Sequence, residues 1–497
     1  ALDEDTSCFY ICKKKAPDAE ININKLNPKA HQLFVGKGGS REKEWKNQQA
    51  LDNNGEAAVK IHRGKQAQAI RDKHPDRIIP SRWLEKWKDM GAEYDNGLKD
   101  PDVAKHLAPK SRWILQGFHD PDIAILNRSV PTPETGDVPL VLQLLASIGA
   151  KAFVGDVKGA FNQGIKGQRP VPLYASPPKE GIPGEDNDII IELVAEVYGL
   201  ITGPPAWRKS LITAFKELGF SKHPLAPCLA LMYANDAKKT FIGCILVETD
   251  DLLGGGVDDK FHNAVIDLRR RFNFGKWVDL METSTEYGGR TLKQAKDFGF
   301  NISMVRYLKE RAREIRLPKG RCKTPEADAN ADEVTAMRGL CGKLNWVTRE
   351  GMPQGAGDAS LLSSTMPTPK VKDLQEANAC LRRLLYSNAS ITIKPIPLDR
   401  LRLLVFADAS LGNATGGQAQ ICHMVCAADA CIHSGQEADV SILAYKSHKM
   451  SRAGSATLLT EANAMSEALA CTEWVASWIG LATDHGYDMR KRYLEQG

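Results

Sequence analysis

Two adjacent aspartates close to the end of a strand-like apolar run constrain the fold of this chain more than any other feature. Residues 241–247 (FIGCILV) have the length and composition of a buried strand, and Asp250 and Asp251 follow after two intervening residues. Neighbouring carboxylates repel each other, so such a pair must be solvated or bound to a metal ion. A third aspartate, Asp156, lies at the end of another strand-like run, residues 153–157. If the two strands are neighbours, the three carboxylates converge on one site.

Three converging carboxylates can hold two divalent cations about 3.5–4 Å apart, which is the arrangement of polymerases and nucleases. Carboxylate oxygens are hard ligands, so we expect two Mg²⁺ ions at this site, with Mn²⁺ as a possible substitute. The alternative is a tight Asp-Asp-Leu turn between two strands that binds no metal. The aspartate pair alone does not decide between these two interpretations.

The composition is that of a globular chain with roughly three domains. Its 497 residues are 42% hydrophobic and 26% charged, and no apolar run is long enough to span a membrane, so we expect no membrane partner. The first residues lack the layout of a signal peptide, and the 11 cysteines include no CxxC pair. These features favour an intracellular, reducing location. The net charge of +5 permits a nucleic-acid partner without requiring one.

Hydrophobic periodicity predicts an alternation of helices and strands along most of the chain. The segment 1–77 is polar and reads as a loosely packed lead-in, with a possible solvated helix within 40–73, and the glycines 254–256 read as a flexible turn. Residues 81–88 and 111–118 predict a hairpin. Helices are expected at 138–148, 205–218, 262–272, 333–347, 370–386 and 458–481, and strands at 153–157, 189–197, 241–247, 297–302 with a continuation over 303–307, 401–407 and 441–445.

Five sequence motifs occur in a fixed order and at fitting distances. They are KSRWILQGF at 110–118, RSVPTP at 128–133, FVGDVKGAFNQG at 153–164, VYGLITGPPAWRKSL at 197–211 and VETDDLLGGG at 247–256. Together they resemble the reverse transcriptase of copia-type LTR retrotransposons, and the resemblance extends from about residue 80 to about residue 481. It implies an α+β fold of fingers, palm and thumb, followed by an α/β RNase H-like domain.

The resemblance also implies domain boundaries. Residues 1–77 would be a polar lead-in or linker, and 78–325 the fingers and palm of the reverse transcriptase. Residues 326–395 would form thumb or connection helices, and 396–497 an RNase H-like domain that is incomplete.

Residue roles follow from the same resemblance. Asp156, Asp250 and Asp251 match the catalytic, metal-binding aspartates of the polymerase palm. Five further residues match substrate-binding positions: Lys110 and Arg112 facing the triphosphate, Phe161 against the sugar of the incoming nucleotide, and Gly199 and Trp207 supporting the templating base pair.

Each of these substrate-binding assignments has a structural alternative. Phe161 could be an ordinary core residue. Lys110 and Arg112 could lie on the solvated face of a hairpin, and Trp207 is better explained by packing than by contact with a substrate. Gly199 is expected to allow a close approach of two backbones.

A second pair of acidic residues resembles part of an RNase H metal site. Asp408 ends the strand-like run 401–407, and Glu461 lies near the start of a long helix. The alternative is a solvent-facing aspartate and a glutamate favoured by the helix dipole. A third acid is expected after that helix, but Asp484 and Asp488 are poor substitutes for it. We therefore expect a partial RNase H domain of doubtful activity.

The chain departs from the family pattern at several positions. Glu248 and Thr249 stand where an aromatic and a small apolar residue are usual, and Asn162 stands where leucine is usual. Glu248 is expected to weaken the site because it adds negative charge. Residues 349–351 read Arg-Glu-Gly where Arg-Pro-Asp is usual. These departures indicate either a diverged lineage or a decaying copy.

The predicted function is RNA-directed DNA polymerase, a nucleotidyltransferase of retrotransposition. Its partners would be an RNA template, a DNA primer and dNTPs, and its location a cytoplasmic particle or the nucleus. The alternative is a degenerate retrotransposon relic that binds nucleic acid without polymerising. The sequence gives no prediction of the oligomeric state.

Overall fold

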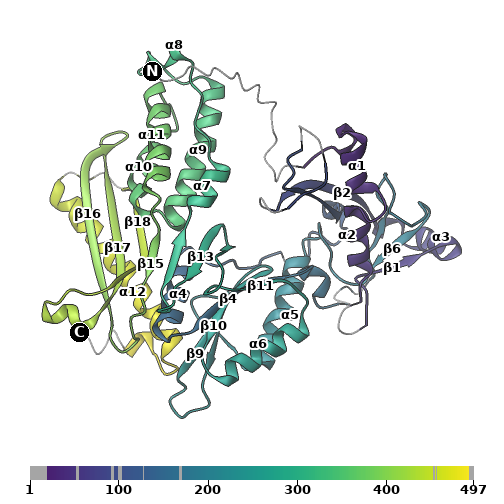
Figure 1. Ribbon diagram of the computed structural model, residues 1–497, viewed down its shortest axis with the longest axis horizontal. Helices are drawn as coiled ribbons and strands as arrows, with labels where there is room; N and C mark the ends of the chain where they lie inside the picture. Colours follow the sequence, from purple (N-terminus) through teal and green to yellow (C-terminus); the bar gives the residue numbers. More distant parts are fainter. Residues whose placement is uncertain are drawn as a thin grey trace. The chain divides into compact units, whose positions relative to one another are not determined.

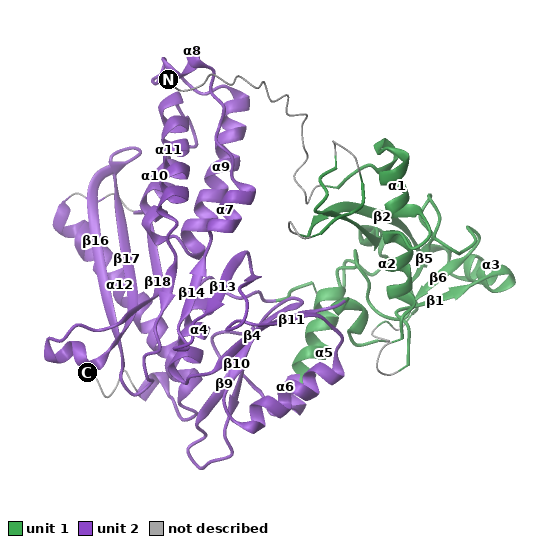
Figure 2. Ribbon diagram, viewed as in Figure 1, with its two compact units in different colours: residues 1–130, 159–214 green, residues 131–158, 215–497 purple. Residues whose placement is uncertain are grey.

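The chain forms two compact units, each built from two separate segments of sequence. The computed structural model describes residues 20–51, 55–90, 94–98, 103–126, 128–166, 169, 171–451, 454 and 456–491. Unit 1 comprises residues 1–130 and 159–214, and unit 2 comprises 131–158 and 215–497 (Figure 2). The mixture of helices and sheets in both units confirms the predicted α+β class (Figure 1).

Unit 1 is organised around a five-stranded sheet with the order β1-β6-β5-β2-β3. Its strands are β1 (Val59–His62), β2 (Ile78–Asp89), β3 (Leu107–Leu115), β5 (Tyr174–Ser176) and β6 (Ile190–Leu193). The predicted hairpin is confirmed, because β2 and β3 pair antiparallel with Trp83 opposite Trp113. Every second residue of β2 is buried, as expected for a strand with one face on the core.

Within 20–77, the described residues pack onto this sheet, so for this part of the segment the expectation of a loosely packed lead-in is wrong. It contains α1 (Pro28–Val35), α2 (Ser40–Gln49) and α3 (Gly64–Lys73) besides β1. Trp45 of α2 is buried and contacts Trp113 edge to face, with 5.4 Å between ring centroids. The segment has few large apolar residues, but Phe34 and Trp45 are both in the core, so its low average hydrophobicity concealed its packing.

Unit 2 contains a six-stranded sheet with the order β11-β4-β10-β9-β8-β7. Its strands are β4 (Lys151–Val157), β7 (Ser221–Lys222), β8 (Leu229–Tyr233), β9 (Phe241–Glu248), β10 (Asp251–Gly256) and β11 (Phe274–Asp279). The helices of this part are α4 (Asp137–Ser147) and α6 (Asp259–Arg271), whereas α5 (Gly203–Glu217) has most of its residues in unit 1.

The glycines 254–256 are part of the buried strand β10, and the prediction of a flexible turn is wrong. β10 pairs with β4 on one side and with β9 on the other. A Cβ added to Gly255 would lie 2.7 Å from the carbonyl oxygen of Lys151, and one added to Gly256 would lie 2.4 Å from the ring of Phe261. The glycines therefore allow neighbouring backbone and the α6 residue Phe261 to approach the strand closely.

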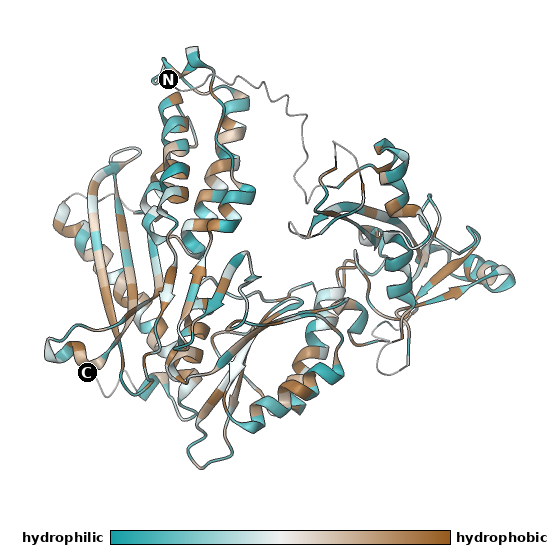
Figure 3. Cartoon of the chain, viewed as in Figure 1, coloured by the Kyte–Doolittle hydropathy of each residue, from teal (hydrophilic) through white to brown (hydrophobic). Residues whose placement is uncertain are grey.

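A small sheet and a helical bundle follow in unit 2. The sheet has the order β12-β13-β14-β15, with β12 (Thr285–Tyr287), β13 (Arg290–Gln294), β14 (Phe300–Ser303) and β15 (Ile391–Ile393). The bundle comprises α7 (Val305–Arg311), α8 (Lys319–Cys322), α9 (Ala331–Glu350), α10 (Ala356–Ser364) and α11 (Val371–Ser387). Both α9 and α11 carry teal and brown positions in Figure 3, as amphipathic helices do.

The starts of two helices in this region, α7 and α9, have clear local causes. The strand continuation predicted over 303–307 is wrong, because α7 begins at Val305. Met304, Val305 and Leu308 share the spacing of a helix face and are buried in the bundle core. The long helix α9 begins with a capping box, in which Asn330 and Glu333 each accept a hydrogen bond from the other's backbone amide.

The C-terminal part of unit 2 is a three-stranded antiparallel meander covered by one long helix. Its strands are β16 (Leu401–Ala414), β17 (Gln418–Asp429) and β18 (Val440–Lys449), and α12 (Thr457–Thr483) packs on β16 and β17. Among the described residues, β16 has a hydrogen-bonded neighbour on one side only. No helix in the described part of the chain combines the length and apolar character that a membrane crossing requires.

Candidate active site

The structure brings Asp156 and Asp251 opposite each other on neighbouring strands. Asp251 begins β10 and Asp156 lies near the end of β4, and the two are directly paired in the antiparallel ladder. Asp250 immediately precedes β10, and its carbonyl oxygen accepts a hydrogen bond from the amide of Val157 at 2.8 Å. The prediction that the two strands are neighbours is therefore confirmed, and the three aspartates lie at one edge of the β4–β10 pair.

Asp250 belongs to a tight two-residue turn. Glu248 pairs with Asp251 across β9 and β10, which leaves Thr249 and Asp250 as the two central residues of the hairpin. Thr249 has a φ of 58°, the left-handed region that a β-branched residue rarely adopts. Such backbone strain persists only where the surrounding structure enforces it. The aspartate pair is therefore held in a constrained turn between two buried strands.

The electrostatic environment of Asp251 is strongly negative. Burial raises the pKa of Asp251 to about 7, and the neighbouring carboxylates of Asp250, Asp156, Glu248 and Glu286 act in the same direction. Each of these groups disfavours a further negative charge at the same place. The site would therefore gain stability from a bound cation.

The donor set fits a hard divalent cation, although the side chains do not yet form a closed site. Within the described ranges, no three His, Cys, Asp or Glu side chains are grouped closely enough to hold a metal ion as they stand. Carboxylate oxygens and uncompensated negative charge are what Mg²⁺ requires. Metal binding by Asp156, Asp250 and Asp251 therefore stays a prediction.

Three residues of unit 1 form a stacked cluster that includes two predicted substrate-binding residues. The guanidinium of Arg112 lies over the ring of Tyr198, 4.7 Å from its centroid. The ring of Phe161 meets the same tyrosine edge to face, with 5.2 Å between centroids. Tyr198 was missed by the sequence analysis, although it stands directly before Gly199 in the VYGL motif. It links the two side chains that the resemblance assigns to the triphosphate and to the sugar.

The other predicted substrate-binding residues of unit 1 differ in their surroundings. Gly199 has a φ of 99°, and an added Cβ would lie 2.1 Å from the carbonyl oxygen of Leu115, so the expected close backbone approach is confirmed. Trp207 is 1% exposed and lies within the core, in agreement with the packing alternative. Lys110 is half-buried on β3, opposite Lys86. The substrate roles of these residues remain predictions.

The predicted RNase H residues lie around one cysteine of the C-terminal sheet. Asp408 on β16 is paired with Cys422 on β17. Burial raises the pKa of the Cys422 thiol, and the carboxylates of Asp408 and Glu461 raise it further. The two acids are thus close to the same side chain. Their role in binding metal remains a prediction.

Asp484 and Asp488 lie at the far end of α12 from Glu461. A helix rises 1.5 Å per residue, so Asp484, the C-cap of α12, is roughly 35 Å along the axis from Glu461. Asp488 lies in the segment whose Tyr487 ring packs against Gly480 at the same helix end. Neither aspartate can complete a site at Glu461 in this structure.

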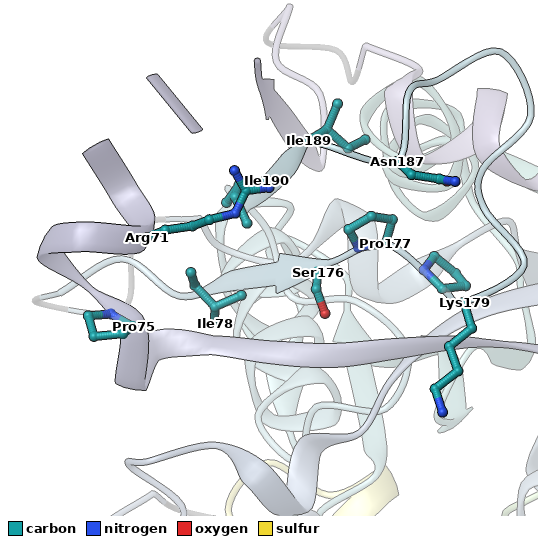
Figure 4. A pocket seen from close by; sticks show the side chains of 10 residues that line it. Arg71, Pro75, Ile78, Ser176, Pro177, Lys179, Asn187, Ile189 and Ile190 are labelled. Carbon is teal, nitrogen blue, oxygen red and sulfur yellow. The ribbon is translucent and has the colours of Figure 1, made fainter. Parts of the chain in front are cut away.

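A pocket of about 580 Å³ lies in unit 1, and no predicted site residue lines it (Figure 4). Its apolar wall includes Ile78, Ile189 and Ile190, and Arg71 and Lys179 contribute positive charge. The Arg71 guanidinium is paired with Asp188 at 2.8 Å. The pocket contributes nothing to the carboxylate cluster.

Comparison with known proteins finds similarity to a transposon protein of yeast. The chain is 24% identical to the putative transposon Ty5-1 protein of Saccharomyces cerevisiae over 263 residues, which cover 50% of this chain and 82% of that protein. A scan against protein-family models finds no match. The resemblance to a retrotransposon protein, first inferred from the five motifs, is confirmed by this match.

Comparison with solved structures returns foamy viral protease-reverse transcriptases. One is a complex with double-stranded DNA, with 12% identity, a TM-score of 0.42, and coverage of 74% of this chain and 54% of the other. A second is a complex with an RNA/DNA hybrid, with 12% identity, a TM-score of 0.41, and coverage of 78% and 42%. The chain thus spans about half the length of these proteins. Likenesses at this level add nothing to the functional argument.

Proposed function

Starting from the resemblance to a retrotransposon protein, we propose that this chain is an RNA-directed DNA polymerase. It would extend a DNA primer on an RNA template by transferring nucleotides from dNTPs to the primer 3′-hydroxyl. The observation that carries the proposal is the pairing of Asp156 with Asp251 on adjacent strands, with Asp250 in the constrained turn beside them. The intracellular location proposed with it is a cytoplasmic particle or the nucleus.

In this proposal Asp156, Asp250 and Asp251 hold two Mg²⁺ ions. When bound, the ions would stabilise the negative charge that develops on the attacking and leaving oxygens. Asp251, whose pKa is raised to about 7, would release its proton as cations enter the site, because ligation favours the carboxylate. The strand pairs that enforce the turn at Thr249 would keep the aspartate pair in place during this change.

The nucleotide contacts would come from the residues to which the resemblance assigns them. Lys110 and Arg112 would offset the negative charge of the triphosphate. Phe161 would pack against the sugar and disfavour a 2′-hydroxyl, which is the group that distinguishes ribose from deoxyribose. The contact of Arg112 and Phe161 with the same Tyr198 ring supports a common role for these residues.

The test is a primer-extension assay on poly(rA)/oligo(dT) with Mg²⁺, using the purified chain and its Asp156→Asn variant. Removing one ligand should lower extension by at least about 100-fold, since metal stabilisation contributes several kcal/mol to the barrier. The melting temperature should not fall, because the substitution relieves repulsion between carboxylates.

An exposed carboxylate on α6 provides the control. Asp267→Asn should extend primers as the unchanged chain does, because Asp267 lies outside the cluster. Extension by the Asp156→Asn protein at the unchanged rate would refute the role of Asp156. If the unchanged, folded chain binds the hybrid without extending it, the alternative of a degenerate relic is supported instead.

A further inference from the structure

Two acidic residues that depart from the family pattern, Glu248 and Glu350, lie close to the same buried arginine. Arg290 begins β13 and is 5% exposed. Its guanidinium forms an ion pair with Glu350, the last residue of α9, which is also buried. A buried arginine is tolerated only where acidic partners compensate its charge. Glu350 is therefore required by Arg290 in this structure.

Glu248, at the end of β9, lies near the same guanidinium. A Cβ added to Gly288 would lie 2.6 Å from Oε2 of Glu248 and 2.8 Å from Nη1 of Arg290. The two atoms are therefore separated by no more than the sum of these distances. Burial lowers the pKa of Arg290, and the carboxylate of Glu248 is the strongest influence that opposes this effect.

The hairpin that carries Arg290 is shaped for this approach. Gly288 and Gly289 form the two-residue turn between β12 and β13, and both have positive φ. A side chain at Gly288 would occupy the space between the carboxylate and the guanidinium. The adjacent Tyr287 is buried, and its hydroxyl donates to the carbonyl oxygen of Leu246 on β9 at 3.4 Å. The hairpin is thus fixed to the strand that leads into the aspartate turn.

Glu248 occupies the base of that turn. It is the direct partner of Asp251 in the β9–β10 ladder. Any contact that fixes Glu248 therefore also fixes the strand end that presents Asp251. This connection runs from α9, through Glu350 and Arg290, to the aspartates.

We propose that Glu248, Arg290 and Glu350 form one positioning set that holds the aspartate turn, so that the charges of both acidic departures are compensated by Arg290 and the departures are not signs of decay. The inference rests on the proposed polymerase function for its catalytic consequence. In this proposal Glu248 supports the aspartate turn. This differs from the expectation, based on its charge alone, that Glu248 weakens the carboxylate site. The three residues touch no substrate and act only through the turn.

The test compares Glu248→Gln, Arg290→Met and the double variant in steady-state primer extension. Glu248→Gln should lower kcat about 5- to 20-fold and leave KM for dNTP within about twofold, because the change disturbs the aspartates and not Lys110, Arg112 or Phe161. The double variant should be no slower than Arg290→Met alone, since coupled residues are not additive. Effects on kcat that simply multiply would overturn the proposal.

Glu286→Gln is the matched control. Glu286 is an exposed residue of β12 whose carboxylate also acts on Asp251, but it has no place in the set. Its neutralisation should change kcat by less than about twofold. If Glu286→Gln and Glu248→Gln lower kcat equally, the effect is one of general charge and the proposal fails.

Thermal melting separates this inference from the proposed function. Arg290→Met should lower the melting temperature by several degrees because buried Glu350 loses its buried cationic partner and keeps only the longer ion pair with exposed Arg349, and adding Glu350→Gln should restore most of the loss. This result is expected even if the unchanged chain extends no primer, in which case only the proposed function fails. If the melting temperature of the Arg290→Met, Glu350→Gln double variant falls by the sum of the two single effects, the two residues are not coupled and the proposed set is refuted.

Discussion

Among single residues, Gly255 has very little room for a side chain. It lies in β10, between β4 and β9, and an added Cβ would be 2.7 Å from the carbonyl oxygen of Lys151 and 3.2 Å from Cα of Ala152. Both atoms belong to the backbone of a paired strand and cannot move without disturbing the ladder. We therefore expect Gly255→Ala to destabilise the fold by roughly 1–3 kcal/mol, the usual cost of overpacking.

Thermal or urea denaturation of Gly255→Ala, beside Gly320→Ala, measures this effect. Gly320 lies in α8, and a Cβ added to it would meet no atom within 4 Å, so its replacement should change stability by less than about 0.5 kcal/mol. Equal stability of the two variants would show that the β4–β10 pair can relax around a methyl group.

Individual residues also show which parts of the candidate site could be predicted from the sequence. The three aspartates could be placed from the sequence because each stands at the end of a strand-like apolar run. The partners Tyr198 and Arg290 could not, since their contacts join segments that are distant in sequence. The glycines of β10 were misread because glycine is usual in turns, and only the paired strands on both sides show why it is needed here.

Among the elements, α4 is buried along almost its whole length and meets α12 through a buried carboxyl group. Nε1 of Trp478 on α12 donates to Oδ1 of Asp137, the first residue of α4, at 3.1 Å. The backbone amide of Glu134 donates to its other oxygen at 2.8 Å. Burial nevertheless raises the pKa of Asp137 to about 6, so desolvation outweighs these hydrogen bonds.

This pKa predicts a pH-dependent contribution to stability. The folded chain holds the Asp137 proton more tightly than the unfolded chain, whose carboxyl has a pKa of about 3.9. The contribution is therefore fully present below about pH 4 and is lost as the pH rises through about 6. Asp137→Asn keeps an uncharged group there at every pH. Relative to the unchanged chain, its free energy of unfolding should therefore increase by about 1–3 kcal/mol between pH 4 and pH 8.

Denaturation curves of both proteins at pH 4.5, 6 and 8 give the difference in their free energies of unfolding. The other titrating groups are the same in both proteins, so their contributions largely cancel in this difference. A difference in unfolding free energy that stays constant over this range would contradict the assignment. Trp478→Phe is a useful companion, since it removes the donor and keeps a ring. It should leave the sign of the pH dependence unchanged.

Long helices were the elements best predicted from sequence, because periodicity accumulates over several turns. The helices α4, α9, α11 and α12 all begin and end within a few residues of the predicted bounds. Short elements such as α7 offer too few residues for the period to be recognised. The strands β16 and β18 extend past their predicted ends because their polar residues face outward and interrupt the apolar pattern.

For the whole molecule, we expect little or no cleavage of an RNA–DNA hybrid. Asp408 and Glu461 supply two acids near Cys422, and Asp484 lies roughly 35 Å from Glu461 along α12. Two metal ions need more ligands than this pair to stabilise both the attacking water and the leaving oxygen. Incubation of the chain with a labelled hybrid and Mg²⁺ or Mn²⁺ tests this. Strong cleavage that disappears in Glu461→Gln would show that another residue completes the site.

Because the segments of the two units alternate along the sequence, paired strands of unit 2 are synthesised at different times. Residues 131–158 belong to unit 2, but the rest of that unit begins at residue 215, after a segment that belongs to unit 1. At 5–20 residues per second, β4 leaves the ribosome on the order of ten seconds before its partner β10. During this interval Asp156 and its apolar neighbours have no sheet to join. A nascent chain that ends before residue 251 therefore exposes β4, an apolar strand that is buried in the folded protein. Such a chain should bind chaperones and be prone to aggregation.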